Sequence, residues 1–290
     1  MRPSEELESS IAAAFELSAR GHDRFAVDSF LAMGSVLVQR AGLRAGEHVL
    51  EVGCGRGSTL LAALDAVGAN GSVMGVDHRP GMVQLAGARV RARHSQGSDV
   101  RLDDVDKPNF QPGSFDVVLA NLMIFQLTDP AKALRHYATL LRPEGRVAFS
   151  TVAAPDRAFS RALGAIARFA PKLSAERGPF RSEAAIRGFL TDHGYERVAI
   201  TEDVLEIRFR DPEHWLEWLW ANGGRDLVDR IPAESLPHAR AAAFEEIEAA
   251  RSPEGDLVLS TAVRFTVAAP KTSARLTPHR NARPSPLGPR

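Results

Sequence analysis

The sequence lacks features that several classes of protein need. Its 290 residues include one cysteine, Cys54, so the chain cannot form an internal disulfide, which fits a reducing compartment. Lys plus Arg and Asp plus Glu number 36 each, and the net charge of zero gives no electrostatic reason to expect nucleic acid as a partner. No apolar run approaches the roughly 18 residues that cross a bilayer, and no signal-peptide core is visible. We therefore expect a cytoplasmic protein with neither a membrane span nor a nucleic-acid partner.

Metal-ligand patterns are also missing. Neither HExxH nor CxxC occurs in the sequence. Five of the histidines share no mutual ligand spacing: His94, His136, His193, His214 and His238. We therefore predict no metal site.

Apolar strand patterns alternate with helical periodicity in the middle of the chain. Expected strands are 49–52, 73–76, 100–102, 115–120 and 146–151, and expected helices are 58–67, 80–93 and 129–141. Strands that alternate with helices pair in parallel, and their continuous apolar character indicates that both faces of the sheet are covered. Two later strands, 198–209 and 257–268, bring the total to seven. The sequence therefore predicts an α/β, doubly wound, mostly parallel seven-stranded sheet.

A glycine-rich turn, EVGCGRG at 51–57, lies between the first expected strand and the first helix after it. Its glycines leave backbone N–H groups open to a ligand, and the helix presents its positive end. The turn departs from the dinucleotide pattern G-x-G-x-x-G, because Ser58 stands at the third glycine position. Glu51 precedes the first glycine by two residues, and a carboxylate there disfavours a pyrophosphate but suits an ammonium or sulfonium group.

Acidic residues also follow the next two expected strands. Asp77 ends the second strand, where a carboxylate can accept hydrogen bonds from a ribose diol. Asp104 follows the third strand and can accept from an adenine amino group, although Asp103 and Asp106 are close neighbours. Because the carboxyl ends of parallel strands meet at one edge, these acids should converge on a nucleoside.

These segments resemble the class I S-adenosylmethionine-dependent methyltransferases, particularly the small-molecule branch similar to the ubiquinone/menaquinone C-methyltransferases. The resemblance rests on VLEVGCGRGS (49–58), GSVMGVDHRPGMV (71–83), DDVDKPNFQPGSFDVV (103–118), LLRPEGRVAFST (140–151) and GPFRSEAAIRGFLTDHGYERV (178–198). It covers most of residues 40–200 and implies the Rossmann-like methyltransferase fold with S-adenosylmethionine as cofactor.

The resemblance also implies which residues contact the methionine part of the cofactor. Glu51, Gly53 and Gly55 would line it, with Cys54 and Gly57 in the same turn. A nucleophilic role for Cys54 is the alternative, but we interpret it as a small residue that the turn requires.

The nucleoside part would lie against the following strand ends. Asp77 would hold the ribose, Met82 would pack on the adenine, and His78 would lie beside them. Asp104 and Val105 would bind the adenine edge.

Asn121, after the fourth strand, would lie beside the transferring methyl group, with a turn-forming role as the alternative. Around it we expect an apolar acceptor pocket, which suggests a hydrophobic or aromatic acceptor. The candidate wall residues are Phe25, Phe30, Met33, Met123, Phe125, Trp215 and Trp218. Core packing is the alternative for the tryptophans.

His22 is a candidate general base. In the resembled family an aromatic residue commonly precedes an Asp in this N-terminal segment, and here the pair is His22 and Asp23. An exposed position at a helix boundary is the alternative.

We divide the chain into a helical cap at 1–42, a methyltransferase domain at 43–269 and a Pro/Arg-rich tail at 270–290, expected to be disordered. A helical insert at about 211–251 would form a lid.

We predict methyl transfer to O, N or C of a small metabolite, with secondary metabolism as the setting to consider first and a homodimer as the assembly to consider first. Non-methylating chemistry on the same fold, such as cyclisation or decarboxylation, is the first alternative, and a quinone-pathway C-methyltransferase is another. A regulatory subunit is disfavoured by the intact motifs, and a dehydrogenase by Ser58 and Glu51.

Overall fold

The computed structural model describes residues 24–93, 97–170, 178–219, 225–228 and 230–271, with only the backbone at 24–30 and 225–226. These residues form a seven-stranded sheet in the order β3-β2-β1-β4-β5-β7-β6. The strands are β1 (His48–Val52), β2 (Ser72–Asp77), β3 (Asp99–Leu102), β4 (Phe115–Ala120), β5 (Leu141–Ala154), β6 (Tyr195–Phe209) and β7 (Leu257–Pro270).

Helices connect these strands and cover both faces of the sheet. The α-helices are α2 (Arg24–Ala41), α3 (Ser58–Val67), α4 (Pro80–Ala92), α5 (Pro130–Leu140), α6 (Arg157–Ala167), α7 (Glu183–Asp192), α8 (Pro212–Leu219), α9 (Arg225–Val228) and α10 (Leu236–Ile247). Two 3-10 turns, η1 (Ile124–Gln126) and η3 (Glu248–Ala250), complete the described elements. Pro80 opens α4, and the Asp129 carboxylate caps α5 by accepting from the backbone N–H of Lys132.

The strand pairing confirms the predicted doubly wound topology. Strands β1 to β5 pair in parallel, and β7 runs antiparallel to both β5 and β6. The chain winds outward from β1 to β3 on one side and from β4 onward on the other. The switch point therefore lies between β1 and β4, where ligands bind at the carboxyl edge of such sheets.

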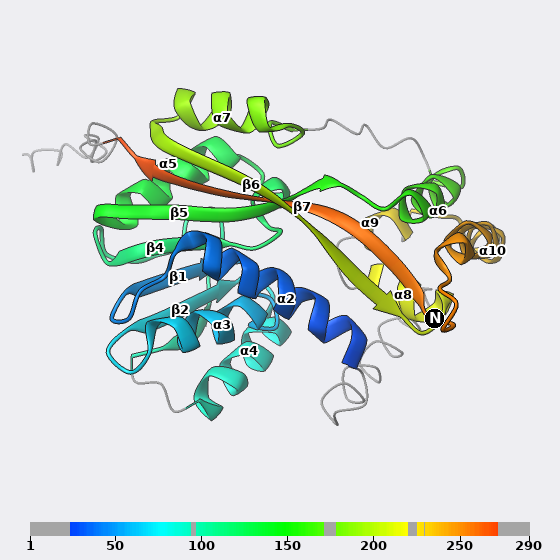
Figure 1. Ribbon diagram of the computed structural model, residues 1–290, viewed down its shortest axis with the longest axis horizontal. Coiled ribbons are helices and arrows are strands. Elements are labelled where there is room, and N and C mark those ends of the chain that lie inside the picture. Colours follow the sequence, from blue (N-terminus) through cyan, green and yellow to red (C-terminus); the bar gives the residue numbers. More distant parts are fainter. Residues whose placement is uncertain (1–23, 94–96, 171–177, 220–224, 229, 272–290) are drawn as a thin grey trace, which may run out of the picture.

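The core has two layers, one on each face of the sheet. One cluster joins α2, α3 and the far end of the β6–β7 ribbon, and the other joins α5 and α7 to the opposite face. Figure 1 shows that the ribbon runs past the carboxyl edge of the parallel strands and carries α8, α9 and α10 at its far end, with α6 beside them. Phe159 of α6 lies edge-on to Trp215 and Trp218 of α8, with ring centroids 6.2 Å away in both cases.

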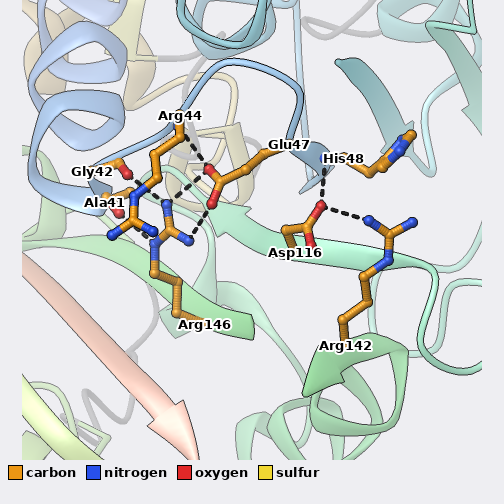
Figure 2. Close-up of polar contacts among 8 residues, drawn as sticks. All are labelled: Ala41, Gly42, Arg44, Glu47, His48, Asp116, Arg142 and Arg146. Atoms are coloured by element: carbon orange, nitrogen blue, oxygen red, sulfur yellow. Dashed lines mark hydrogen bonds and ion pairs between the residues drawn. The ribbon is translucent and has the colours of Figure 1, made fainter. Parts of the chain in front are cut away.

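Ion pairs hold the opposite, amino edge of the sheet together. Arg146 of β5 pairs with Glu47 at 2.8 Å and donates to the carbonyl oxygens of Ala41 and Gly42, which end α2 (Figure 2). A cation at a helix C-terminus satisfies carbonyls that have no partner within the helix. These contacts line a groove of about 610 Å³ and fix α2 to the sheet at the end away from the glycine turn.

Several boundaries differ from those predicted, and strand β6 begins at Tyr195 rather than at residue 198. Strand β5 is longer than 146–151, because Leu141 already pairs with Phe115 across a register shift. Strand β7 reaches Pro270, and the N–H of Lys271 donates to the carbonyl of Gly194, so the sheet continues past residue 269. Residues 1–23 of the predicted cap and residues 272–290 of the tail lie outside the described residues. Within the described part, no helix combines the length and apolar character that crossing a membrane requires.

Candidate functional site

The carboxyl ends of β1, β2 and β3 bring three acids to one edge of the sheet. Glu51 pairs in register with Gly75 of β2, and Asp77 of β2 pairs with Leu102 of β3. Asp104 is the second residue after the end of β3 at Leu102. Because these strands are adjacent and parallel, the predicted acids lie along one edge of the sheet, with Glu51 of β1 nearest the switch point.

Glu51 is a buried carboxyl group with one unsatisfied oxygen. Its residue is 1% exposed, and its Oε2 atom has no hydrogen-bond partner among the described residues. The pKa of Glu51 is raised to about 8, mainly by burial and also by the nearby Asp77, while hydrogen bonds from Thr59 and from the backbone of Leu60 oppose the rise. A buried carboxylate without a cation is unfavourable, so this group is suited to receive a positively charged ligand.

Asp77 is held rigidly at the end of β2. One carboxylate oxygen accepts from the backbone N–H of Gly55 at 2.9 Å, and the other accepts from the backbone N–H of Arg79 at 2.9 Å. The residue is 2% exposed. Each oxygen keeps a second lone pair, so the carboxylate can still accept from a diol. Arg79 was not predicted from the sequence; besides its backbone N–H, its guanidinium Nε lies 3.6 Å from Oδ1 of Asp77.

Asp104 and Val105 lie in a loop that the core holds in place. The hydroxyl of Tyr137 donates to the carbonyl of Val105 at 2.5 Å, and Val105 is buried. Both carboxylate oxygens of Asp103 accept backbone N–H groups of the loop. Asp104 is exposed, and one of its oxygens accepts from the N–H of Asp106. Asp103 therefore maintains the loop, while Asp104 lies exposed beside it.

The glycine turn is closely covered at one position and open at another. Gly53 has φ +66°, and a Cβ there would lie 2.3 Å from Cγ of Met123. Gly55 has φ +53°, and a Cβ there would meet nothing within 4 Å. Open space above Gly55 fits a ligand on this backbone, whereas Gly53 makes room for the segment after β4. Gly57, with φ +83°, precedes α3.

Cys54 does not have the properties of a nucleophile. It is 5% exposed, and burial raises the pKa of its thiol, with Glu51 and Asp77 adding to the shift. A neutral buried thiol is unreactive.

Two predicted contacts of the nucleoside, His78 and Met82, are more exposed than Asp77. His78 is exposed, with its Nδ1 4.0 Å from Asp77, and Met82 is half-buried in the first turn of α4.

Asn121 belongs to a polar network that the sequence did not reveal. Its Nδ2 donates to the hydroxyl of Thr59, and its Oδ1 accepts from the hydroxyl of Ser150. Thr59 and Ser150 are 2% and 0% exposed. Ser150 follows the apolar run 147–149 of β5, and a hydroxyl at that position was the one available signal.

Two predicted wall residues of the acceptor pocket are almost completely buried. Met33 is 2% exposed and Trp215 is 0% exposed, and both belong to the hydrophobic core. For Trp215 this favours the core-packing alternative, and contact of either residue with an acceptor stays a prediction. Met123 lies against Gly53, Phe125 is 44% exposed and Trp218 is half-buried.

Three further predictions cannot be compared with the structure. His22 lies outside the described residues, and Phe25 and Phe30 lie in the part of α2 where only the backbone is described.

Within the described part, no group of His, Cys, Asp and Glu is arranged to hold a metal.

The site fits S-adenosylmethionine on its own geometry. The buried, unsatisfied oxygen of Glu51 suits a cationic methionine part, and the open face of Gly55 leaves room for it. Asp77 and Asp104 offer acceptors in the order ribose, then adenine, along adjacent strands.

The sequence matches the family described as methyltransferase domain over residues 26–200. It is 33% identical over 250 residues to nocamycin O-methyltransferase of Saccharothrix syringae, covering 80% of this chain and 88% of that one. It is 36% identical over 141 residues to aklanonic acid methyltransferase of Streptomyces sp. strain C5, covering 49% of this chain and 64% of that one.

Solved structures share the fold at low identity. The YcgJ protein of Bacillus subtilis has a TM-score of 0.55 at 17% identity, covering 83% of this chain and 98% of that one. The [4+2]-cyclase SpnF has a TM-score of 0.51 at 18% identity, with coverage of 83% and 82%. Phosphoethanolamine N-methyltransferase 2 of Haemonchus contortus, solved with S-adenosyl-L-methionine, has a TM-score of 0.50 at 15% identity, with coverage of 82% and 52%.

A fold shared by methyltransferases and a cyclase does not by itself identify a reaction. The family match spans more than half of the chain, and the relative from Saccharothrix syringae is similar over most of both chains. The chain belongs to the methyltransferase domain family and is an S-adenosylmethionine-dependent methyltransferase.

Proposed function

We propose that this enzyme methylates an oxygen of a small, largely apolar secondary metabolite with an acidic hydroxyl or carboxyl group. The names of its two similar relatives support this acceptor class, since one is an O-methyltransferase and the other acts on aklanonic acid. An acidic oxygen is already ionised near neutral pH, so its methylation needs no strong general base. His22 remains a proposed base for a less acidic acceptor.

The observation that carries the proposed cofactor site is the buried Glu51 carboxyl group with its unsatisfied Oε2 beside Asp77. When bound, S-adenosylmethionine supplies a methyl group on a sulfonium, which an acceptor oxygen removes by in-line displacement. In this assignment Glu51 and the glycine turn at 51–57 hold the methionine part. Asp77, His78 and Met82 contact the ribose and adenine, and Asp104 and Val105 bind the adenine edge.

We place the acceptor beside the segment that follows β4. Asn121 would lie next to the methyl group, and Met123, Phe125 and Trp218 would provide apolar contacts. Phe125 supports this role because it is a large aromatic residue that is 44% exposed. The residues of the protein would act mainly by aligning the acceptor oxygen and excluding water.

We further propose that residues 1–42 form a cap and residues 211–251 a lid over this acceptor. Support comes from the position of α8, α9 and α10 at the far end of the β6–β7 ribbon, beyond the carboxyl edge (Figure 1). We also propose a cytoplasmic enzyme without a nucleic-acid partner, consistent with its zero net charge and single thiol. A homodimer is the assembly to test first, by light scattering.

Product mass tests the reaction. Purified enzyme would be incubated with S-adenosylmethionine and a panel of aromatic and polyketide acids, their methyl esters and their hydroxyl-blocked analogues. O-methylation adds the mass of one methylene to the acceptor and releases S-adenosylhomocysteine. Cyclisation would leave the acceptor mass unchanged and consume no cofactor, and that outcome would support the alternative chemistry on this fold.

A further inference from the structure

A continuous run of hydrogen bonds crosses the site from β5 to β1. The backbone N–H of Leu122 donates to the Ser150 hydroxyl oxygen at 2.8 Å, and that hydroxyl donates to Oδ1 of Asn121 at 2.6 Å. Nδ2 of Asn121 donates to the Thr59 hydroxyl oxygen at 3.1 Å. Thr59 in turn hydrogen-bonds the carboxyl group of Glu51. We refer to this run as the Leu122–Glu51 chain.

The donors of the Leu122–Glu51 chain are arranged in one direction. The Ser150 oxygen accepts from the backbone N–H of Leu122, and the Ser150 hydroxyl donates to Oδ1 of Asn121. With its oxygen on that side, the Asn121 amide turns its nitrogen toward Thr59 and donates to the Thr59 hydroxyl oxygen. The single proton of Thr59 is then available for the carboxyl group of Glu51. With Glu51 ionised, every donor of the chain points toward the carboxylate.

The chain is buried and ends at an unusual backbone conformation. Thr59 and Ser150 are 2% and 0% exposed, so water does not compete with their hydrogen bonds. Leu122 has φ +50°, which side-chain-bearing residues rarely adopt, and the bond to Ser150 supports it. The next residue, Met123, packs on Gly53. The conformation of this segment thus depends on the same hydrogen bonds that reach Glu51.

The charge on Glu51 determines whether every donor in the Leu122–Glu51 chain has a hydrogen-bond acceptor. A carboxylate accepts the Thr59 proton and polarises the bonds behind it, because buried hydrogen bonds in series strengthen one another. A protonated Glu51 can instead donate to the Thr59 oxygen, which already accepts from Asn121. A cation beside the unsatisfied Oε2 of Glu51 favours the carboxylate and so the fully directed chain.

We propose that Thr59 and Ser150 are positioning residues that couple cofactor binding at Glu51 to the conformation of segment 121–127. Cofactor binding thereby orders the side of the site where the acceptor lies, which favours cofactor before acceptor. The assignment of this segment to the acceptor rests on the proposed function. The coupling itself concerns only cofactor and protein and can be measured without an acceptor.

Hydrogen exchange tests the coupling. The probe is S-adenosylmethionine at a saturating concentration, set for each variant from its dissociation constant by calorimetry, and the readout is exchange in the peptide spanning residues 120–127. In the wild type we expect the cofactor to slow exchange about fivefold or more, within the usual range of coupling between sites. In Thr59→Val and Ser150→Ala the slowing should fall below about twofold. Thr59→Ser restores the hydroxyl and should restore the slowing.

Thr151 provides a matched control. It follows Ser150 in β5, is 1% exposed, and its hydroxyl has no hydrogen-bond partner among the described residues. Thr151→Val should keep the wild-type slowing, since it removes a buried hydroxyl outside the Leu122–Glu51 chain. Thermal unfolding of each variant separates lost coupling from lost folding, and Thr59→Ser keeps the test open where Thr59→Val is unstable.

The possible outcomes are distinct. Loss of slowing in Thr59→Val and Ser150→Ala, with recovery in Thr59→Ser and retention in Thr151→Val, supports the coupling. Equal slowing in the wild type and in both chain variants at saturation overturns it, even though the cofactor binds. Failure of the wild type to bind S-adenosylmethionine would contradict the cofactor site and this inference together.

Discussion

The parallel strands β1 to β4 and the β6–β7 ribbon belong to one sheet but use buried side chains differently. The parallel half holds polar groups out of water, with Glu51 and Asp77 at 1% and 2% exposed. The ribbon and its helices bury aromatic groups such as Trp215 and Phe209, both 0% exposed. A charged nucleoside needs hydrogen-bond acceptors that rigid strands hold in place. An apolar methyl acceptor needs only a pocket of complementary shape. In our proposal the half that contains β1 to β4 binds the cofactor and defines the chemistry, and the proposed lid would determine the methyl acceptor without a change of fold.

Trp215→Ala should give the largest effect on stability and separate the two halves. Removing this fully buried side chain leaves a cavity in the lid core, which typically costs about 3–5 kcal/mol. Thermal or urea unfolding measures the loss. Phe125→Ala is the control, because that aromatic side chain is 44% exposed and should lower stability by less than about 1 kcal/mol. A stable Trp215→Ala protein with a raised acceptor KM would instead indicate direct stacking on substrate.

Asp77→Asn should give the largest effect on cofactor affinity. Hydrogen bonds to a charged group each contribute about 1.5–3 kcal/mol. Asparagine replaces one acceptor oxygen with an NH2 group and leaves the other uncharged, so loss of one bond to a ribose diol and weakening of the second predict about hundredfold weaker binding. Calorimetry with S-adenosylmethionine checks this. Asp65→Asn is the control, since Asp65 pairs with Arg93 at the surface, with its side chain 64% exposed. Equal affinity in Asp77→Asn and the wild type would break the assignment of β2 to the ribose.

Glu51→Gln should weaken cofactor binding about tenfold while stabilising the free enzyme at high pH. The pKa of Glu51 is about 8 in the folded chain and 4.5 ordinarily, so the folded state loses stability as pH rises from about 4.5 through about 8. Glutamine removes that loss. Thermal unfolding should show a variant that is more stable than the wild type at pH 9, with the advantage shrinking toward pH 5. A difference in thermal stability between variant and wild type that stays constant with pH would contradict a neutral buried carboxyl group at Glu51.

Gly164→Ala should change the free energy of unfolding least among these variants. It tests whether α6 and the strands that bind the cofactor are independent. Gly164 lies inside α6, and a Cβ there would meet nothing within 4 Å. Alanine in place of glycine within a helix stabilises by up to about 1 kcal/mol. Cofactor affinity should stay within about twofold of the wild type. A larger change in affinity would show that α6 and the cofactor half are not independent.

The cofactor half could be predicted from the sequence because its signals are local. A short apolar strand, a glycine turn and an acid at a fixed offset define Glu51 and Asp77 without knowledge of distant contacts. The hydroxyls of Thr59 and Ser150 carry no such signal, since their partners come from other strands and helices. Their roles became visible only when β1, β4 and β5 were placed side by side.

The acceptor half was harder to predict for a physical reason. An apolar side chain suits both a core and a pocket wall, so composition cannot separate Met33 and Trp215 from Phe125. The packing of α6 and α8 decided that Trp215 is buried. Burial of a large aromatic residue is a property of the whole lid rather than of its own sequence neighbourhood.

The most direct test of the account is the number of protons released when S-adenosylmethionine binds at pH 7, measured by calorimetry in buffers of different ionisation enthalpy. A carboxyl group that is neutral in the free enzyme and ionised beside a cation predicts release of about one proton by the wild type and almost none by Glu51→Gln. Equal proton release by the two proteins, or binding of equal strength, would contradict the role of Glu51 as the buried acid that receives the cationic cofactor.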